Sequence, residues 1–111
     1  QPRVMEAGGG LKAPGDSVLL SCHSFGLPFK NSAVRRYRQA AGARLEWVSI
    51  ISASSSVIRF RPSVQGRATI SRDNSQSVAF LSLRALHLRD SACYFCTVYT
   101  ERGNVAELEQ K

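Results

Sequence analysis

The stretch from Asp90 to Cys96 constrains the fold of this chain more than any other. It reads Asp-Ser-Ala-Cys-Tyr-Phe-Cys, which indicates a strand with an aspartate at its approach and a tyrosine two residues before a cysteine. The obvious partner for Cys96 is Cys22, which ends the strand-like segment Leu19 to Cys22. A bridge between them would join an early strand to a late one through the middle of a small all-β domain. Closing so long a loop would lower the conformational entropy of the unfolded chain and so stabilise the fold by roughly 4 kcal/mol in the entropic account of disulfides.

The cysteine count is odd, because the chain has three. A pair of bridged cysteines indicates an oxidising compartment, which predicts a secreted or extracellular protein. Cys93 lies an odd number of residues from Cys96, and on a strand such a spacing places the two side chains on opposite faces. We therefore expect Cys96 to be buried and Cys93 to be the spare thiol. Cys93 is then either a small residue on the sheet surface or a link between two copies.

The composition bounds the class of protein. A chain of 111 residues, 43% of them hydrophobic, suits one domain spanning residues 1–111 with its own core. No apolar run approaches the roughly 20 residues of a transmembrane helix, so no membrane partner is expected. The net charge of +7 predicts attraction to acidic surfaces. The twelve arginines are scattered rather than aligned as a stripe, which argues against nucleic acid as the partner.

The rest of the chain predicts short strands separated by turns. Segment 17–21 alternates, with Val18 and Leu20 on the same face as Cys22, and segments 33–39, 45–52, 67–71 and 78–83 also have strand character. The serine loop from Ala53 to Ser56 is typical of a hairpin tip. Many short strands with no long helical period favour a β-sandwich.

Several segments together resemble an antibody heavy-chain variable domain from Gln1 to Cys96. They are Gly8-Gly9-Gly10-Leu11, Leu20-Ser21-Cys22, Arg38-Gln39-Ala40, Leu45-Glu46-Trp47-Val48-Ser49, Thr69-Ile70-Ser71-Arg72-Asp73-Asn74-Ser75 and the stretch from Asp90 to Cys96. The resemblance implies an all-β, V-type immunoglobulin β-sandwich with one inter-sheet disulfide, Cys22–Cys96. It also implies an ion pair between Arg67 and Asp90 at the bottom of the sandwich and a tyrosine corner at Tyr94.

The same resemblance implies an antigen-binding surface made of three loops. It places them at about Leu27 to Arg35, Ile51 to Arg59 and Thr97 to Glu101. The candidate contact residues combine small polar groups with an aromatic anchor, as binding loops do, and Tyr99 is the first candidate for the anchor. They are Lys30, Asn31, Ser32, Ala33, Arg35, Ser52, Ser54, Ser55, Ser56, Arg59, Tyr99, Thr100 and Glu101. The arginines among them either favour an acidic protein surface as the antigen or are simply solvated.

A second surface is implied for pairing with another domain. Its residues are Tyr37, Gln39, Arg44, Leu45, Trp47 and Phe95. Leu45 and Trp47 are of the type that contacts a light-chain variable domain, whereas Tyr37 and Arg44 resemble antibodies that work without a light chain. The sequence leaves open a light-chain variable domain, a second copy of this chain, or no pairing partner.

Three departures from the family pattern stand out. Arg36 occupies the inward position of the family's core tryptophan, so it must snorkel out, pair with a buried carboxylate, or shift the strand register. Ala68 and Ala79 replace larger apolar groups. In the final segment only Gly103 keeps the family's bulge pattern, so a last strand over Val105 to Lys111 is doubtful.

Enzyme chemistry has little support. His23 and His87 are far apart, and no metal-spaced Cys/His cluster or nucleophile motif is present, so we expect no catalytic residue, no metal and no cofactor.

The sequence predicts antigen binding by an immunoglobulin heavy-chain variable domain. The alternative is an immunoglobulin-like receptor or assembly module that pairs through its Tyr37/Arg44/Leu45/Trp47 face. A variant with an eroded framework is the third interpretation.

Overall fold

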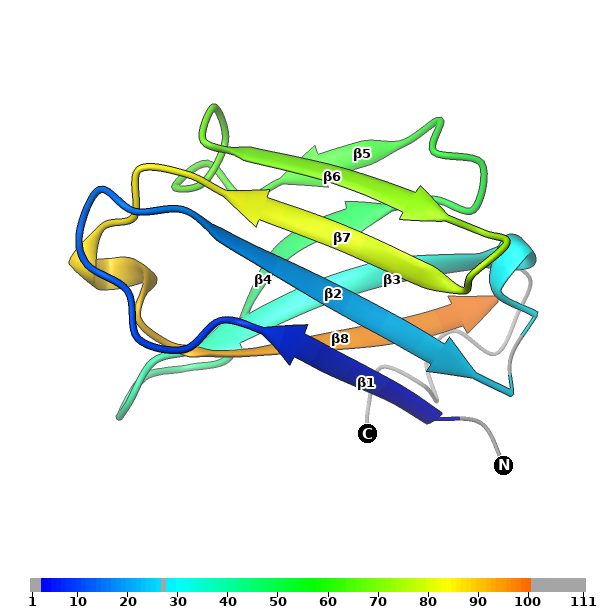
Figure 1. The fold of residues 1–111 in the computed structure, drawn as a ribbon, viewed down its shortest axis with the longest axis horizontal. Coiled ribbons are helices and arrows are strands. Elements are labelled where there is room, and N and C mark those ends of the chain that lie inside the picture. The colour runs from blue at the N-terminus through cyan, green and yellow to red at the C-terminus, as the bar shows by residue number, and fades with distance from the viewer. Residues whose placement is uncertain (1–2, 27, 101–111) are drawn as a thin grey trace.

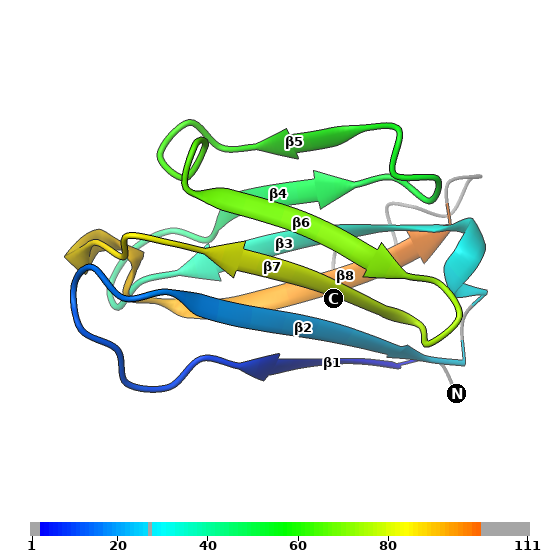
Figure 2. The same ribbon diagram turned by 45° about the horizontal axis from the view of Figure 1, so that its top comes forward.

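The computed structural model describes residues 3–26 and 28–100, which form two antiparallel sheets packed face to face (Figures 1 and 2). The first sheet has the order β1 (Arg3–Gly8), β2 (Val18–Phe25), β7 (Val78–Leu83) and β6 (Ala68–Asp73). The second has the order β5 (Ile58–Phe60), β4 (Glu46–Ile51), β3 (Ser32–Gln39) and β8 (Cys93–Thr100). Two short 3-10 turns, η1 (Phe29–Asn31) and η2 (Leu88–Asp90), complete the described elements. The predicted all-β sandwich is confirmed.

The disulfide joins the two sheets as expected. Cys22 on β2 and Cys96 on β8 are bridged across 74 residues, with their Cα atoms 6.2 Å apart. Alternation along β2 turns Leu20 and Cys22 inward, because successive side chains of a strand point to opposite faces. Cys93 is free and exposed, so the parity argument for the spare thiol is confirmed.

The core lies between the sheets in two clusters. One surrounds the disulfide and contains Phe29, Val34, Ile51, Ala79 and Val98. The other contains Leu20, Val48, Val64, Ala68, Leu81 and Leu83. Both alanines that replace larger groups are therefore buried core residues.

Arg36 lies inside this core and is 0% exposed. Its Nη2 donates to Glu6 Oε2 at 3.4 Å and to the carbonyl oxygen of Ala79 at 3.1 Å. Pairing with a buried carboxylate is confirmed and snorkelling is wrong, because Glu6 reaches inward from β1. The pairing of β3 with β4 also shifts register between Arg36 and Tyr37. Desolvation raises the pKa of Glu6 and lowers that of Arg36, although the attraction between the two charges opposes both shifts.

A second charged cluster closes the end of the sandwich near η2. The carboxylate of Asp90 accepts hydrogen bonds from Arg67 Nη1 at 2.9 Å, Arg38 Nη1 at 3.0 Å and the backbone N–H of His87 at 2.8 Å. The Tyr94 hydroxyl donates to the Asp90 carbonyl oxygen at 2.7 Å. Desolvation alone would raise the pKa of Asp90, but the hydrogen bonds from Arg67, the His87 backbone and Arg38 lower it to about 2. The predicted Arg67–Asp90 pair and the tyrosine corner are both confirmed.

Candidate functional site

The first two predicted loops meet at the end of the sandwich opposite η2, where one arginine of β6 connects them. Arg72 Nη2 donates to the carbonyl oxygen of Phe29 and Arg72 Nη1 to that of Ser52, each at 2.8 Å. The guanidinium also lies 4.4 Å from the centre of the Phe29 ring, and Nε donates to Asn74 Oδ1 at 2.7 Å. A cation over an aromatic face adds to these bonds. Arg72 therefore fixes the positions of both loops relative to each other.

The second loop is held by its own serines. The Ser52 N–H donates to the Val57 carbonyl oxygen at 2.9 Å, and the Val57 N–H donates to Ser52 Oγ at 3.0 Å. Ser54 Oγ donates to Ser56 Oγ at 2.9 Å, and Ser55 adopts the left-handed region with φ of 67°. Residues 54–56 are exposed above this scaffold. The loop presents small polar groups in a fixed arrangement.

The predicted loop bounds need correction. β3 already begins at Ser32, and β8 continues through Thr100, because the two strands pair in register as far as Ser32 opposite Thr100. Residues 32–35 and 97–100 therefore belong to strands and not to loops. Leu27 and Glu101 lie outside the described residues, as does the whole segment from Arg102 to Lys111.

Exposure divides the predicted contact residues into three groups. The exposed ones are Lys30, Asn31, Ser54, Ser55, Ser56 and Arg59, and the partly exposed ones are Arg35, Ser52 and Thr100. The buried ones are Ser32, Ala33 and Tyr99. Tyr99, the first candidate for the anchor, is only 5% exposed in the unliganded domain. Its hydroxyl accepts a hydrogen bond from Arg35 Nη2 at 3.0 Å.

Arg35 connects the loop end to the outer face of the second sheet. Its guanidinium lies 5.2 Å from the centre of the Tyr99 ring, and its Nη1 donates to the Tyr37 hydroxyl at 3.3 Å. The sequence indicated each of these residues but not their contact. The two tyrosines hold the Arg35 side chain in place beneath the loops.

The predicted pairing surface is an outward face of β3, β4 and β8 with large exposed apolar groups. Leu45 is 54% exposed, Phe95 46% and Trp47 39%. Gln39 and Arg44 are also exposed, and Tyr37 is partly exposed. The free thiol of Cys93 lies on the same side of β8 as Phe95, two residues away. Tyr37 lies opposite both Trp47 and Phe95 in the strand pairing, so these three side chains share one face of the second sheet, and Arg44 and Leu45 are exposed in the turn between β3 and β4.

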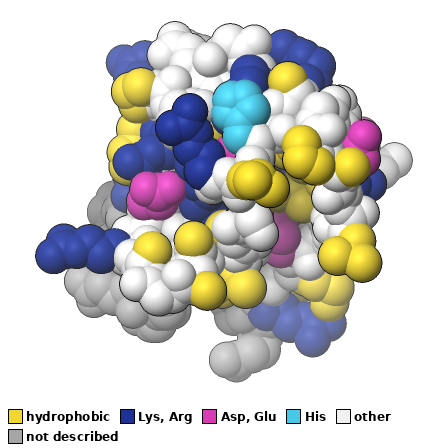
Figure 3. Space-filling model, turned by 90° about the vertical axis from the view of Figure 1, so that its left-hand side faces the viewer, with side chains coloured by type: hydrophobic (Ala, Val, Ile, Leu, Met, Phe, Trp, Pro, Cys, Tyr) yellow, Lys and Arg dark blue, Asp and Glu magenta, His cyan; other side chains and the backbone are white. Residues whose placement is uncertain are grey.

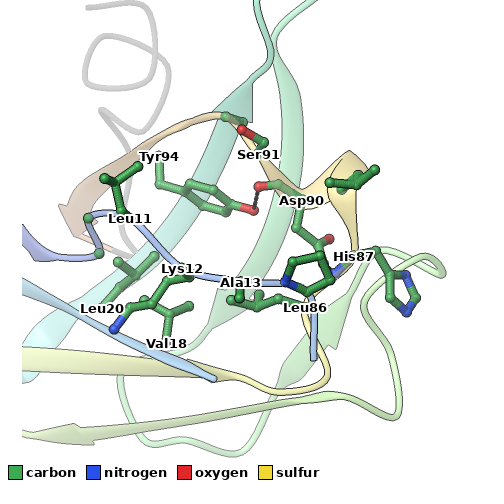
Figure 4. Close-up of a pocket in the computed structure, with 15 residues that line it drawn as sticks. Leu11, Lys12, Ala13, Val18, Leu20, Leu86, His87, Asp90, Ser91 and Tyr94 are labelled. Carbon is green, nitrogen blue, oxygen red and sulfur yellow. Dashed lines mark hydrogen bonds between the residues drawn. The ribbon is translucent and has the colours of Figure 1, made fainter. Parts of the chain in front are cut away.

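A cavity of about 270 Å³ lies at the η2 end of the sandwich, between segment 9–14 and the start of β8 (Figure 4). Leu11, Val18, Leu20, Leu86 and Tyr94 give it a largely apolar lining. His87, Asp90 and Ser91 also line it, but the His87 ring points away from the cavity, and the Asp90 carboxylate is engaged by Arg38 and Arg67. These three residues therefore do not form the relay of a hydrolase. The surface of this end mixes apolar and basic side chains without a single-sign patch (Figure 3).

Within residues 3–26 and 28–100, no group of three or more His, Cys, Asp or Glu side chains could hold a metal ion. No helix of this part is long and apolar enough to cross a membrane. The features that the described residues do provide are a rigid loop end and an apolar sheet face.

Two four-stranded antiparallel sheets joined by a single inter-sheet disulfide define a V-type immunoglobulin sandwich. Residues 10–110 match the family model of the Immunoglobulin V-set domain, and the chain belongs to this family. V-set domains are generally binding or recognition modules and are typically not enzymes. They commonly pair with other immunoglobulin domains or bind ligands, and they are typically extracellular or secreted.

Proposed function

We propose that this chain is a heavy-chain variable domain that binds an antigen non-covalently through its loop end, as one domain spanning residues 1–111. The observation that carries the proposal is the bridge from Arg72 to the carbonyl oxygens of Phe29 and Ser52. It makes two loops that are distant in sequence into one surface before any ligand arrives. Such preorganisation lowers the entropy cost of binding.

The contact residues that we propose are the exposed members of this surface. Lys30 and Asn31 come from the first loop, the serines at 54–56 from the second, and Arg59 from β5 beside it. Segments 28–31 and 52–57 carry no acidic side chain, so the charge of these two loops is positive. This favours an acidic protein surface as the antigen, because complementary charges raise the association rate and the specificity.

Arg35 and Tyr99 support the surface from below. Their stacked and hydrogen-bonded arrangement keeps the guanidinium within reach of the surface while burying the tyrosine ring. A partly exposed, immobilised arginine resembles the residues that dominate binding energy in other interfaces. We propose Arg35, in place of Tyr99, as the principal anchor.

The experiment that tests the proposal is a screen of the displayed domain against a panel of purified extracellular proteins, followed by charge reversal. The variant Lys30→Glu/Arg59→Glu reverses two exposed cations of the loop end. Arg89→Glu makes the same kind of change on exposed η2, at the other end. The proposal requires a panel ligand whose binding is lost in the first variant and kept in the second. A ligand that tolerates the first variant and is lost on Trp47→Ser would contradict it.

The second candidate function is an assembly module that pairs through its sheet face. The exposed apolar side chains of Leu45, Trp47 and Phe95 favour it, because monomeric proteins rarely leave such groups clustered in solvent. Under the heavy-chain proposal the same face pairs with a light-chain variable domain. Under the second candidate it pairs with another copy of the chain and no antigen is bound.

A further inference from the structure

The centre of the sandwich contains polar atoms that the protein leaves without partners. Arg36 uses a single nitrogen, Nη2, for all of its hydrogen bonds: to Glu6 Oε2, to the carbonyl oxygen of Leu20 at 3.4 Å and to that of Ala79. Its Nε and Nη1 are buried and make no hydrogen bond among the described residues. Since a guanidinium carries five N–H donors, three of them are unused.

Two unused acceptors lie in the same part of the core. Glu6 Oε1 is buried without a partner, although the other oxygen of this carboxylate meets Arg36. Ser49 Oγ is also buried without a partner, and Ser49 is the direct neighbour of Arg36 in the β3–β4 pairing. Residues directly opposite each other on antiparallel strands place their side chains on the same face, about 4.5–5.5 Å apart at Cβ. Ser49 and Arg36 therefore place their side chains on the same face of the second sheet, and Glu6 contacts Arg36 there.

Two of the buried residues beside Arg36 have small side chains. Ala79 and Ser49 are each 0% exposed, and Ala79 stands where the sequence pattern leads us to expect a larger apolar group. A buried polar group that makes no hydrogen bond destabilises the fold, so several of them in one core would be severely destabilising. A ligand that both donates and accepts hydrogen bonds would remove that cost.

We propose that the core holds an internal water site beside Arg36, in which one or more water molecules accept from Nε or Nη1 and donate to Glu6 Oε1 or Ser49 Oγ. Water fits the site because buried water typically makes about three hydrogen bonds to groups that are otherwise unsatisfied. A metal cation would be repelled by the guanidinium. An anion would match the arginine donors but would meet the Glu6 carboxylate.

A crystal structure that shows ordered solvent tests the proposal directly. The expected result is a buried water within about 2.7–3.2 Å of Arg36 Nε or Nη1 and also of Glu6 Oε1 or Ser49 Oγ. A core in which Arg36 is enclosed without water, or from which it turns to the surface, overturns the proposal. Crystals grown with sodium bromide provide a further arm, because an anomalous peak at this position would identify an anion instead.

Water magnetic relaxation dispersion tests the same site in solution by counting long-lived internal waters. Arg36→Trp fills the position with an apolar ring and should lower the count by at least one relative to the unchanged chain. Ser17→Ala, at an exposed serine outside the core, is the control and should leave the count unchanged. Equal counts in the unchanged chain and Arg36→Trp overturn the proposal. Should Arg36→Trp fail to fold, the crystal structure of the unchanged chain still decides the question.

Discussion

Two arginine–carboxylate clusters are buried in this domain, and they differ in how completely their hydrogen bonds are made. Around Asp90, both carboxylate oxygens accept bonds from Arg67, one oxygen also binds Arg38, and the other binds the His87 backbone N–H. Around Arg36, one nitrogen makes every bond, and Glu6 Oε1 has no described partner. The pKa of the carboxyl group follows the difference, lowered at Asp90 and raised at Glu6.

The comparison shows that burial by itself does not decide what a charge contributes. Taking charges out of water costs free energy in both clusters, and the cost is recovered only where the remaining donors and acceptors are satisfied. We therefore expect the Asp90 cluster to stabilise the fold strongly. The Arg36–Glu6 pair should be replaceable by apolar or neutral groups. Four predictions test this contrast.

The largest expected effect comes from breaking the better-satisfied cluster. Asp90→Asn removes the charge that Arg38 and Arg67 share while keeping the shape of the side chain. We expect the free energy of unfolding at pH 7 to fall by about 3–5 kcal/mol, because two arginines lose their buried counter-ion. Urea denaturation measures this loss. Asp16→Asn, at an exposed carboxylate, is the control and should change the midpoint little, whereas an equally small change in Asp90→Asn would contradict the comparison.

Replacing both members of the other pair should have the opposite sign. Arg36→Trp/Glu6→Gln removes both charges of this pair and places an apolar ring beside the small side chain of Ala79. We expect the free energy of unfolding to rise by about 1–4 kcal/mol, as when other buried ion pairs are replaced by well-packed groups. Urea denaturation of the double variant measures the gain. A loss of stability would show that the pair contributes more than its geometry indicates.

The single variant Glu6→Gln should change stability little. Arg36 loses its counter-ion but keeps the carbonyl oxygens of Leu20 and Ala79 as acceptors. Because desolvation raises the pKa of Glu6, the fold already favours the neutral form of this side chain, so we expect Glu6→Gln to change the free energy of unfolding at pH 7 by no more than about 1 kcal/mol, clearly less than Asp90→Asn. Urea denaturation of the two variants side by side measures both changes in the free energy of unfolding. A larger loss in Glu6→Gln than in Asp90→Asn would contradict the contrast between the two clusters.

The pH dependence of stability should separate the two carboxyl groups most finely. Because the folded pKa of Asp90 is depressed, its contribution is present above its unfolded pKa of about 4 and is lost as the pH falls toward about 2. The folded pKa of Glu6 is raised, so protonation of this carboxyl group favours the folded state. Its contribution to stability is therefore gained as the pH falls through the folded pKa and lost as the pH rises through it. The acid-side slope of stability between pH 6 and pH 2 should therefore become shallower in Asp90→Asn but not in Glu6→Gln, while Glu46 and Asp73, whose pKa values are also lowered, keep part of the slope in both variants. Identical slopes in the two variants would refute this assignment.

The sequence predicted those parts of the fold that follow from strand parity and from contiguous motifs. The disulfide, the inward position of Arg36, the exposed thiol of Cys93 and the Arg67–Asp90 pair were all predicted and are confirmed. Each depends on which face of a strand a residue occupies or on a segment whose pattern is specific. The last strand lies outside the described residues and stays a prediction.

Contacts to the backbone of distant segments could not be predicted. Arg72 was recognised only as part of a framework motif, because its partners are carbonyl oxygens of two loops far away in the chain. Glu6 was not identified as the carboxylate that meets Arg36, since no periodicity connects an edge strand to a core position. The loop bounds were wrong because the in-register pairing of β3 and β8 extends the strands to Ser32 and Thr100.

In the function that we propose, this V-set domain is the heavy-chain half of a binding unit, and a light-chain variable domain covers its apolar face. Light scattering of the purified chain, alone and mixed with a light-chain variable domain, tests this claim most directly. We expect a one-to-one complex in the mixture, and we expect this complex to be lost in Trp47→Ser. A chain that ignores the light-chain domain, or that forms its own dimer in preference, would contradict the claim. A dimer that separates on reduction would point to Cys93 and to the assembly module.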